Sequence, residues 1–228
     1  MPSPSPGSRT PRLTLLDQVV SDIEAFCGPR CYLVGVDGVD GAGKTTFAND
    51  IAAVLTRRSR RCVRISMDDF HQPRETRYRL GPRSPEGFWL DSYDYRSFEE
   101  NVLKGLRPGG DRRVRRAVHD LDTDDRLDLP WDTAPIGAVV VIDGIFLHRD
   151  ELVEAWDYSI FLDVPFKLSV ARMAARDGSA PDPADPSIAR YVEGQRMHLR
   201  ACRPWERATV VIDNSQPDLP RLRSALTG

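Results

Sequence analysis

The chain reads Gly38-Val39-Asp40-Gly41-Ala42-Gly43-Lys44-Thr45 between an apolar run, Cys31 to Val36, and a helix-like run that extends to Arg57. This octapeptide matches G-x-x-x-x-G-K-[ST] at every fixed position, and a phosphate-binding loop requires the same context of a strand before and a helix after. Glycines let the backbone turn tightly enough to point successive N–H groups at phosphate oxygens, and the following helix contributes its positive end. The stretch therefore predicts a nucleoside triphosphate site.

Two side chains of this loop carry the expected chemistry. Lys44 brings a positive charge to the β- and γ-phosphates, and the Thr45 hydroxyl is an oxygen ligand of the type that Mg²⁺ prefers. ATP and Mg²⁺ are the expected cofactors, although these residues do not distinguish ATP from GTP. The residues expected to hold the nucleotide are Gly38, Val39, Asp40, Gly41, Ala42, Gly43, Lys44, Thr45 and Thr46.

Length and composition favour a single enzyme domain. The chain has 228 residues and a formal net charge of −2, so no overall charge attracts nucleic acid or an anionic membrane. Its four cysteines lack C-x-x-C or zinc-type spacing and are interpreted as reduced thiols, and no apolar stretch approaches the length of a membrane span. We expect a cytoplasmic protein with a small-molecule substrate and neither nucleic acid nor membrane as a partner. Whether it acts alone or as a homo-oligomer is left open.

Apolar runs alternate with helical stretches along the chain. Met1 to Arg12, rich in Pro and Ser, reads as a disordered tail, and 13–228 as one domain with a substrate-binding insertion at about 71–130. Such alternation predicts an α/β fold in three layers, with a mainly parallel sheet and helices on both faces. The expected strands are Cys31 to Val36, Cys62 to Met67, Ala138 to Ile142, Tyr158 to Val164 and Thr209 to Ile212.

Acidic residues follow two of these strands. Ligands of parallel sheets bind at the carboxyl ends of the strands, so these residues are candidates for the chemistry. Asp68 is the candidate general base that takes a proton from an acceptor hydroxyl, although adjacent Asp69 is an alternative because neighbouring side chains in an extended backbone point to opposite sides. Asp143 ends four consecutive apolar residues and is the candidate second ligand of Mg²⁺.

Two arginines precede a loop rich in Gly, Pro and Asp at about 177–186, which we interpret as a lid. Arg172 and Arg176 lie four residues apart on the expected helix Phe166 to Arg176 and therefore share one face. Guanidinium groups beside a mobile loop can neutralise charge on a transferring phosphoryl group. Ordinary exposed helix arginines are the competing interpretation.

These separated motifs resemble those of the uridine kinase and phosphoribulokinase family of P-loop kinases, over roughly Cys31 to Asn214. Asp68-Asp69-Phe70-His71 resembles the family's D-x-F-Y stretch, and Arg172 with Arg176-Asp177 resembles its R-x-x-x-R-D lid. The resemblance implies the P-loop NTPase fold, phosphorylation of a hydroxyl group on a small metabolite, and Asp68 as the general base.

The resemblance also implies which residues contact the acceptor. Leu90 to Tyr95 is similar to the family's H-P-D-A-F-D region, which implies that Asp94 holds ribose hydroxyls, and Val118 to Leu121 is similar to P-V-Y-D-F, which puts His119 against the nucleoside base. The chain departs from the family where His71 and His119 replace tyrosines and Arg190 replaces an amide. The residues implied to contact the acceptor are Asp69, Phe70, His71, Asp94, His119 and Arg190.

The acceptor that this reading favours is the ribose 5′-hydroxyl of a nucleoside, as in a uridine or cytidine kinase. The Asp68-Asp69-Phe70 stretch also resembles that of nicotinamide riboside kinases, so a kinase of nicotinamide riboside or of another metabolite is an alternative. The phosphate loop also resembles that of thymidylate kinase, in which case Arg74, Arg77 and Arg79 are candidates to bind an acceptor phosphate. A regulatory P-loop ATPase is the alternative of a different class, whereas the N-K-x-D motif of GTPases does not occur.

Overall fold

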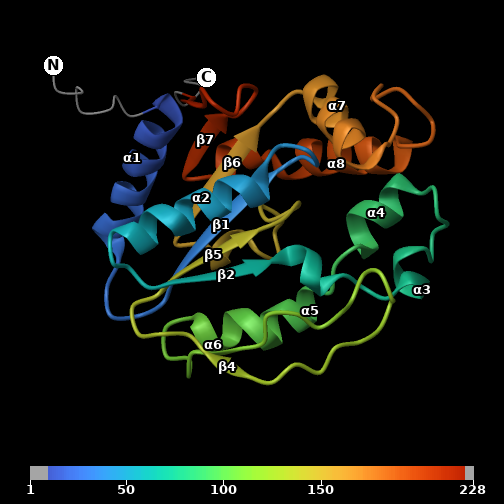
Figure 1. Ribbon diagram of the computed structural model, residues 1–228. Helices are drawn as coiled ribbons and strands as arrows, with labels where there is room; N and C mark the ends of the chain where they lie inside the picture. The colour runs from blue at the N-terminus through green and yellow to red at the C-terminus, as the bar shows by residue number, and fades with distance from the viewer. Residues whose placement is uncertain (1–9, 224–228) are drawn as a thin grey trace, which may run out of the picture.

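A six-stranded sheet lies at the centre of residues 10–223, which the computed structural model describes (Figure 1). Its strand order is β2-β5-β1-β6-β7-β8, and all neighbours are parallel except β7 and β8, which are antiparallel. The strands are β1 (Tyr32–Gly38), β2 (Cys62–Ser66), β5 (Val139–Asp143), β6 (Tyr158–Asp163), β7 (Val210–Asp213) and β8 (Arg221–Leu222).

The pairing of the strands brings three segments of the chain together at one edge. Asp143 at the end of β5 is in register with Val36 of β1 on one side and with Ser66 of β2 on the other. Because parallel strands end on the same side, the phosphate loop, Asp143 and the residues after Ser66 are neighbours in space. The topology thus gathers three segments that are separate in sequence, the phosphate loop at 38–45, the residues after Ser66, and Asp143.

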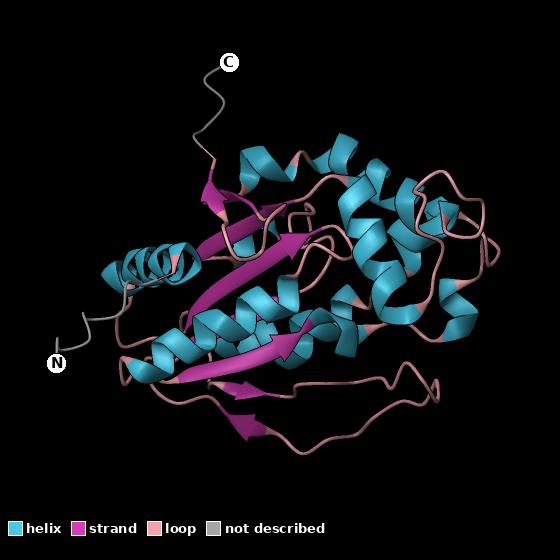
Figure 2. Ribbon diagram, turned by 45° about the horizontal axis from the view of Figure 1, so that its top comes forward, coloured by secondary structure: helices cyan, strands magenta, loops and turns pink. Residues whose placement is uncertain are grey.

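Two helices cover the first face of the sheet, α1 (Pro11–Phe26) and α2 (Lys44–Arg57), as Figure 2 shows. Apolar residues at helical spacing on both helices pack on the strand residues that point to this face. The core here includes Val19, Ile23, Phe47, Ile51, Val34, Val141 and Leu162. α1 begins at Pro11, two residues earlier than the sequence suggested, and residues 1–9 of the expected tail lie outside the described part of the chain.

The segment expected as a substrate-binding insertion packs on the second face. It contains α3 (Arg74–Arg77), α4 (Pro85–Asp91), α5 (Tyr95–Phe98), a π-helical turn (Glu99–Leu103) and α6 (Lys104–Leu106). A small antiparallel pair, β3 (Arg113–Val114) and β4 (Asp132–Thr133), completes it. Phe98, Val102 and Leu106 join the strand residues Ile65, Val140 and Ile142 in one core, so the insertion is part of the same domain.

The C-terminal part supplies α7 (Phe166–Asp177), α8 (Ala189–Cys202) and α9 (Pro204–Arg207). α7 ends at Gly178 in the left-handed conformation, and residues 178–188 form the loop that joins it to α8. α8 packs along α4, with Tyr191 against Phe88 at 5.0 Å between ring centroids. The loop expected as a lid therefore lies between two helices that both border the carboxyl end of the sheet.

The predicted fold class is confirmed: the sheet is mainly parallel, carries helices on both faces, and uses all five of the expected strands within two residues of their predicted ends. Among the residues described, none of the helices is both long and apolar enough to cross a membrane.

Candidate active site

The phosphate loop wraps around the N-terminus of α2. Gly41 and Gly43 have φ angles of +72° and +88°, a region that side chains rarely allow, and Gly43 is the residue that caps α2. The Lys44 Nζ donates to the carbonyl oxygen of Val39 at 3.0 Å and lies 4.0 Å from the Asp40 carboxylate. The ammonium is thus held across the opening of a cradle of main-chain N–H groups.

Thr45 and Asp143 provide two adjacent oxygen ligands beside this cradle. The Thr45 hydroxyl donates to Asp143 Oδ2 at 2.6 Å, and Asp143 is almost fully buried. Arg64, from β2, holds the other carboxylate oxygen at 2.5 Å and keeps the buried charge paired. A hydroxyl and a carboxylate oxygen fit Mg²⁺, which favours hard oxygen ligands and takes few protein carboxylates.

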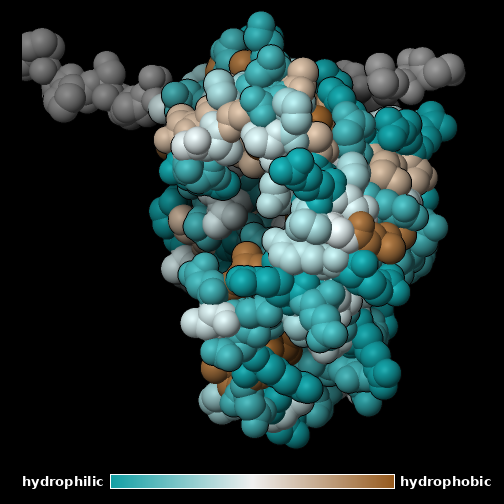
Figure 3. Space-filling view, turned by 90° about the vertical axis from the view of Figure 1, so that its right-hand side faces the viewer, coloured by the Kyte–Doolittle hydropathy of each residue, from teal (hydrophilic) through white to brown (hydrophobic). Residues whose placement is uncertain are grey.

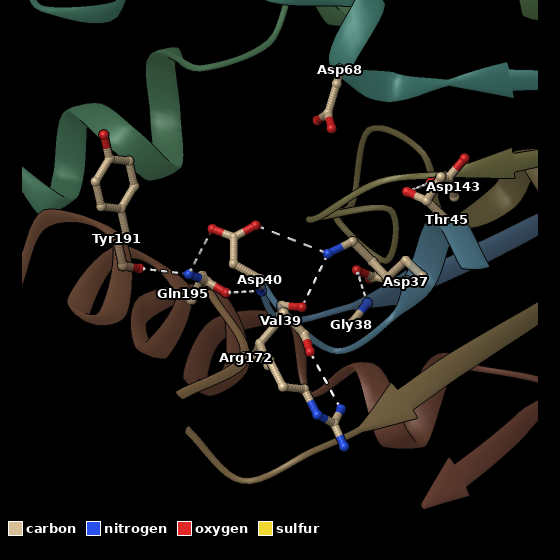
Figure 4. A network of polar contacts seen from close by, with 12 residues as sticks. Asp37, Gly38, Val39, Asp40, Thr45, Asp68, Asp143, Arg172, Tyr191 and Gln195 are labelled. Carbon is tan, nitrogen blue, oxygen red and sulfur yellow. Dashed lines mark hydrogen bonds and ion pairs between the residues drawn. The ribbon is translucent and has the colours of Figure 1, made fainter. Parts of the chain in front are cut away.

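Asp68 faces the phosphate loop from the end of β2 (Figure 4). Its carboxylate is exposed, and Oδ1 accepts a hydrogen bond of 2.8 Å from the phenol of Tyr93, which is buried. Burial and the nearby carboxylates raise the pKa of Tyr93 well above its usual value of 10.0, so the phenol remains protonated and donates. The bond fixes one oxygen of Asp68 and leaves the other free to take a proton.

Asp40, Asp68 and Asp69 give this end of the site a negative field. Burial, opposed in part by Lys44, raises the pKa of Asp40, and the charge of Asp68 contributes to the rise. Burial also raises the pKa of Asp69, with further contributions from Asp68 and Asp143. Because the charge of Asp68 acts on both Asp40 and Asp69, the three carboxylates share one region, where an additional negative charge is unfavourable.

A buried carboxylate anchors the end of β1 beneath the loop. Asp37 Oδ1 accepts from the Gly38 N–H at 2.7 Å, and Oδ2 accepts from His148 through its main-chain N–H at 3.1 Å and its Nδ1 at 2.7 Å. Burial alone would raise the pKa of Asp37, but the hydrogen bonds and charges of His148 and His198 outweigh it and lower the pKa below its ordinary value. An ionised carboxylate therefore ties the loop to the segment after β5.

The two arginines of α7 lie in different environments. Arg172 donates to the carbonyl oxygens of Gly41, Asn214 and Ser215 at 3.3, 3.0 and 2.8 Å, and Figure 4 shows it across the phosphate loop from Asp68. Arg176 has a side chain that is 69% exposed and pairs with Asp177 at 3.0 Å. Arg172 therefore holds the loop in this conformation, whereas the exposed Arg176 contacts its neighbour Asp177, and its predicted role toward a transferring group stays a prediction.

Two residues predicted to contact the acceptor lie near Asp68. The His71 ring donates from Nδ1 to the Asp68 carbonyl at 2.7 Å and packs on Tyr93 at 4.5 Å, and its pKa is lowered mainly by burial. Asp94 caps α5, accepting from the N–H and the hydroxyl of Ser97 at 2.9 and 2.7 Å. A carboxylate has further lone pairs, so the predicted ribose contact of Asp94 stays a prediction.

Three other predicted acceptor residues have mainly structural contacts here. Phe70 is fully buried in the core, edge-on to Phe98 at 5.0 Å. His119 is buried and its Nε2 lies 3.1 Å from Asp124 Oδ1. Arg190 donates to the carbonyl oxygens of Arg77, Gly81 and Ser84 at 3.0, 3.3 and 3.2 Å and so fixes the segment before α4. The predicted contacts of these three residues with an acceptor stay predictions.

Sequence reasoning missed Arg64 and Tyr93. Arg64 is a charged residue inside an apolar strand, between buried Val63 and Ile65, and such a residue needs a partner. That signal was present in the sequence, but the partner, Asp143, depends on the pairing of β2 with β5. Tyr93 gave no such signal, because a buried phenol is common in cores and its bond to Asp68 joins two distant segments.

Known proteins share both the sequence pattern and the fold. The family model described as "Phosphoribulokinase / Uridine kinase family" matches residues 33–182. Uridine kinase from Ureaplasma parvum serovar 3 is 28% identical over 149 residues, which cover 64% of this chain and 68% of that protein. Uridine kinase from Saccharomyces cerevisiae is 27% identical over 156 residues, 64% of this chain and 29% of that protein.

A solved structure of a possible uridine kinase from Bacillus stearothermophilus superposes with a TM-score of 0.69 at 22% identity. The superposition covers 86% of this chain and 96% of that one, so the two share the fold. The family model spans about two thirds of the chain, including the phosphate loop, Asp68, Asp143 and both arginines of α7. The chain is therefore a P-loop kinase that belongs to the phosphoribulokinase and uridine kinase family.

Proposed function

We propose that this kinase transfers the γ-phosphate of ATP, with Mg²⁺, to the 5′-hydroxyl of a nucleoside such as uridine or cytidine. The observation that carries the proposal is the exposed Asp68 carboxylate, oriented by buried Tyr93 and facing the phosphate loop from a nearby strand end. A base in this position removes the proton of a hydroxyl that attacks a phosphate in the loop. The uridine kinases among the relatives support the choice of acceptor.

The loop residues bind and orient the triphosphate. The main-chain N–H groups around Gly41 and Gly43 bind phosphate oxygens, and Lys44 leaves the Val39 carbonyl to contact the β- and γ-phosphates. Thr45 and Asp143 are the residues that would hold Mg²⁺. When Mg²⁺ is bound, it would neutralise part of the negative charge of the phosphates.

The transfer step is a displacement at the γ-phosphorus. The acceptor oxygen forms the new O–P bond, the bond from the γ-phosphorus to the β-bridging oxygen breaks, and ADP leaves with the electron pair. The proton of the acceptor hydroxyl passes to the carboxylate oxygen of Asp68 that Tyr93 does not bind. Lys44 stays near the oxygens on which negative charge develops.

The negative field around Asp68 supports an uncharged or cationic acceptor. The charge of Asp68 contributes to the raised pKa of both Asp40 and Asp69, and a phosphate on the acceptor would add to the repulsion. The side of the molecule toward which β1 and β2 point is mainly hydrophilic, with only scattered apolar side chains (Figure 3). A polar metabolite such as a nucleoside suits both features.

Two of the three arginines that a monophosphate kinase would need, Arg77 and Arg79, are engaged elsewhere. Arg77 donates to the Gln72 carbonyl at 2.7 Å and to Asp124 at 3.2 Å, and Arg79 pairs with Asp91 at 2.9 Å. The guanidinium groups of Arg77 and Arg79 are thus each paired with a carboxylate of the same segment. This supports a nucleoside over a nucleoside monophosphate as the acceptor.

A panel of acceptors incubated with γ-labelled ATP and Mg²⁺ tests the proposal. It contains nucleosides, nicotinamide riboside, pantothenate, ribulose 5-phosphate and nucleoside monophosphates. Label is expected in a nucleoside product, and nicotinamide riboside, which is cationic, is the next candidate. Label confined to a phosphorylated acceptor would contradict the charge argument, and phosphate release stimulated only by a macromolecule would indicate a regulatory ATPase.

Arg176→Ala is expected to lower kcat about tenfold and to leave the KM for ATP within about twofold, because an exposed guanidinium that closes over the site contributes mainly in the transition state. Steady-state kinetics with ATP as the varied substrate measure both constants. Arg96→Ala removes another exposed arginine, on α5, whose side chain is 87% exposed, and is the control. A higher KM at unchanged kcat would instead assign Arg176 to ground-state binding of ATP.

A further inference from the structure

The phosphate loop is held from outside by a side chain of α8. The Asp40 main-chain N–H donates to Gln195 Oε1 at 2.6 Å, and Gln195 Nε2 donates back to Asp40 Oδ2 at 3.2 Å (Figure 4). The same Nε2 donates to the Tyr191 carbonyl at 3.0 Å, one turn earlier. Gln195 is only 3% exposed, so its amide is fully committed to this arrangement.

The neighbouring loop residue is held by α7. The Gly41 carbonyl accepts from Arg172, and a Cβ on Gly41 would lie only 2.2 Å from the carbonyl oxygen of Ser169. Asp40 is therefore held by α8 and the next residue, Gly41, by α7. Residues 178–188 connect these two helices. A shift of the loop when phosphate binds must move these helices or break their contacts.

Gln195 also fixes the orientation of the Asp40 carboxylate. It occupies the main-chain N–H of Asp40, and it holds Oδ2 while Oδ1 faces Lys44 at 4.0 Å. Asp40 is close enough to Asp68 for the two charges to affect each other. Rotation of the Asp40 side chain would change the field at both the ammonium and the candidate base.

We propose that Gln195 is a positioning residue that links the phosphate loop to the segment 178–188 through α8. Nucleotide in the loop then orders this segment, and the amide fixes Asp40 beside Lys44. The proposal rests on the proposed function only in requiring nucleotide binding to the phosphate loop. Gln195 itself touches neither nucleotide nor acceptor and acts through Asp40.

Exchanging the amide and the carboxylate between positions 195 and 40 distinguishes a positioning role of Gln195 from a role in core packing alone. Gln195→Glu keeps an acceptor for the Asp40 N–H but turns a carboxylate oxygen toward Asp40 Oδ2, where a donor is required. Adding Asp40→Asn restores a donor opposite that oxygen with the net charge unchanged. Asp40→Asn alone keeps the original pair, because its amide oxygen accepts from Gln195, and serves as the reference.

The readout is hydrogen exchange of residues 178–188 with and without saturating ADP and Mg²⁺, which needs no acceptor. In the wild-type protein, ADP is expected to slow exchange there about tenfold, a typical coupling between two sites. We expect less than about twofold slowing in Gln195→Glu and recovery to the Asp40→Asn level in the double variant. Gln195→Met, which lacks charge and hydrogen bonds, should also lose the effect.

Full protection by ADP in Gln195→Glu, or a double variant no better than the single one, would overturn the proposal. Thermal unfolding of each variant shows whether it is folded, and Gln195→Met replaces Gln195→Glu as the test if the charged variant does not fold. Should the wild-type protein phosphorylate no acceptor while ADP still protects 178–188 in a Gln195-dependent way, the proposed function fails and this inference stands. Absence of ADP-dependent protection in the wild type overturns the inference alone.

Discussion

Asp68→Asn is expected to lower kcat by about 10² to 10⁴ while the Kd for ATP changes little, which is the loss expected for a general base. Asparagine has nearly the same shape and can still accept from Tyr93, so the position of the side chain is retained. It has no basic oxygen to take the proton of the acceptor. Rapid-quench measurement of a single turnover with saturating ATP isolates this step from product release.

Asp69→Asn is the matched control for that experiment. It removes the same charge from the adjacent exposed position, and its carboxylate lacks a bond to Tyr93 among the described contacts. We expect a loss of less than about tenfold, since only the field at the site changes. The reverse order of effects would assign the base to Asp69, and near-normal turnover in Asp68→Asn would remove Asp68 from the mechanism.

Lys44→Ala is expected to lower kcat/KM for ATP by about 10² to 10³, with effects on both the Kd and kcat. The ammonium is the side-chain cation at the opening of the phosphate cradle, held by the Val39 carbonyl at 3.0 Å. Its removal withdraws a donor that contacts phosphate in the ground state and gains strength as charge develops. Isothermal titration with a non-hydrolysable ATP analogue measures the affinity, and steady-state kinetics measure kcat.

Lys167→Ala provides the comparison for Lys44, because this lysine is exposed in the first turn of α7. It should leave affinity and turnover within about twofold, as expected for an exposed substitution away from the site. Unchanged nucleotide affinity and rate in Lys44→Ala would contradict the assignment of Gly38 to Thr46 as the triphosphate site.

The strands and the phosphate loop were predictable because their signals are local. An apolar run of four to seven residues predicts a buried strand whatever it pairs with, and the glycines at 41 and 43 are required by their own φ angles. Asp143 was predictable for the same reason, because it directly follows four consecutive apolar residues. Ends of elements were less predictable, as at Pro11, because a capping residue such as Thr10 depends on one hydrogen bond.

The residues that contact the acceptor were harder to predict, because most of the candidates lie on short helices and loops between β2 and β5. Phe70 matched a family pattern, yet it packs on Phe98 in a contact that no local pattern encodes, and His119 lies 3.1 Å from Asp124, which also pairs with the distant Arg77. Arg190 likewise bonds to main-chain carbonyls of a segment more than a hundred residues away. In each case, tertiary packing decided which way the side chain points.

The amino-acid sequence alone determined the α/β class, the phosphate loop and the acidic groups at the strand ends, because backbone conformation and hydrophobic periodicity act over a few residues. Only the tertiary structure decided that β5 lies between β2 and β1, and hence that Arg64 meets Asp143, that Tyr93 orients Asp68 and that Gln195 reaches Asp40. Such pairs join positions far apart along the chain, and the free energy that selects them is that of the whole packed core.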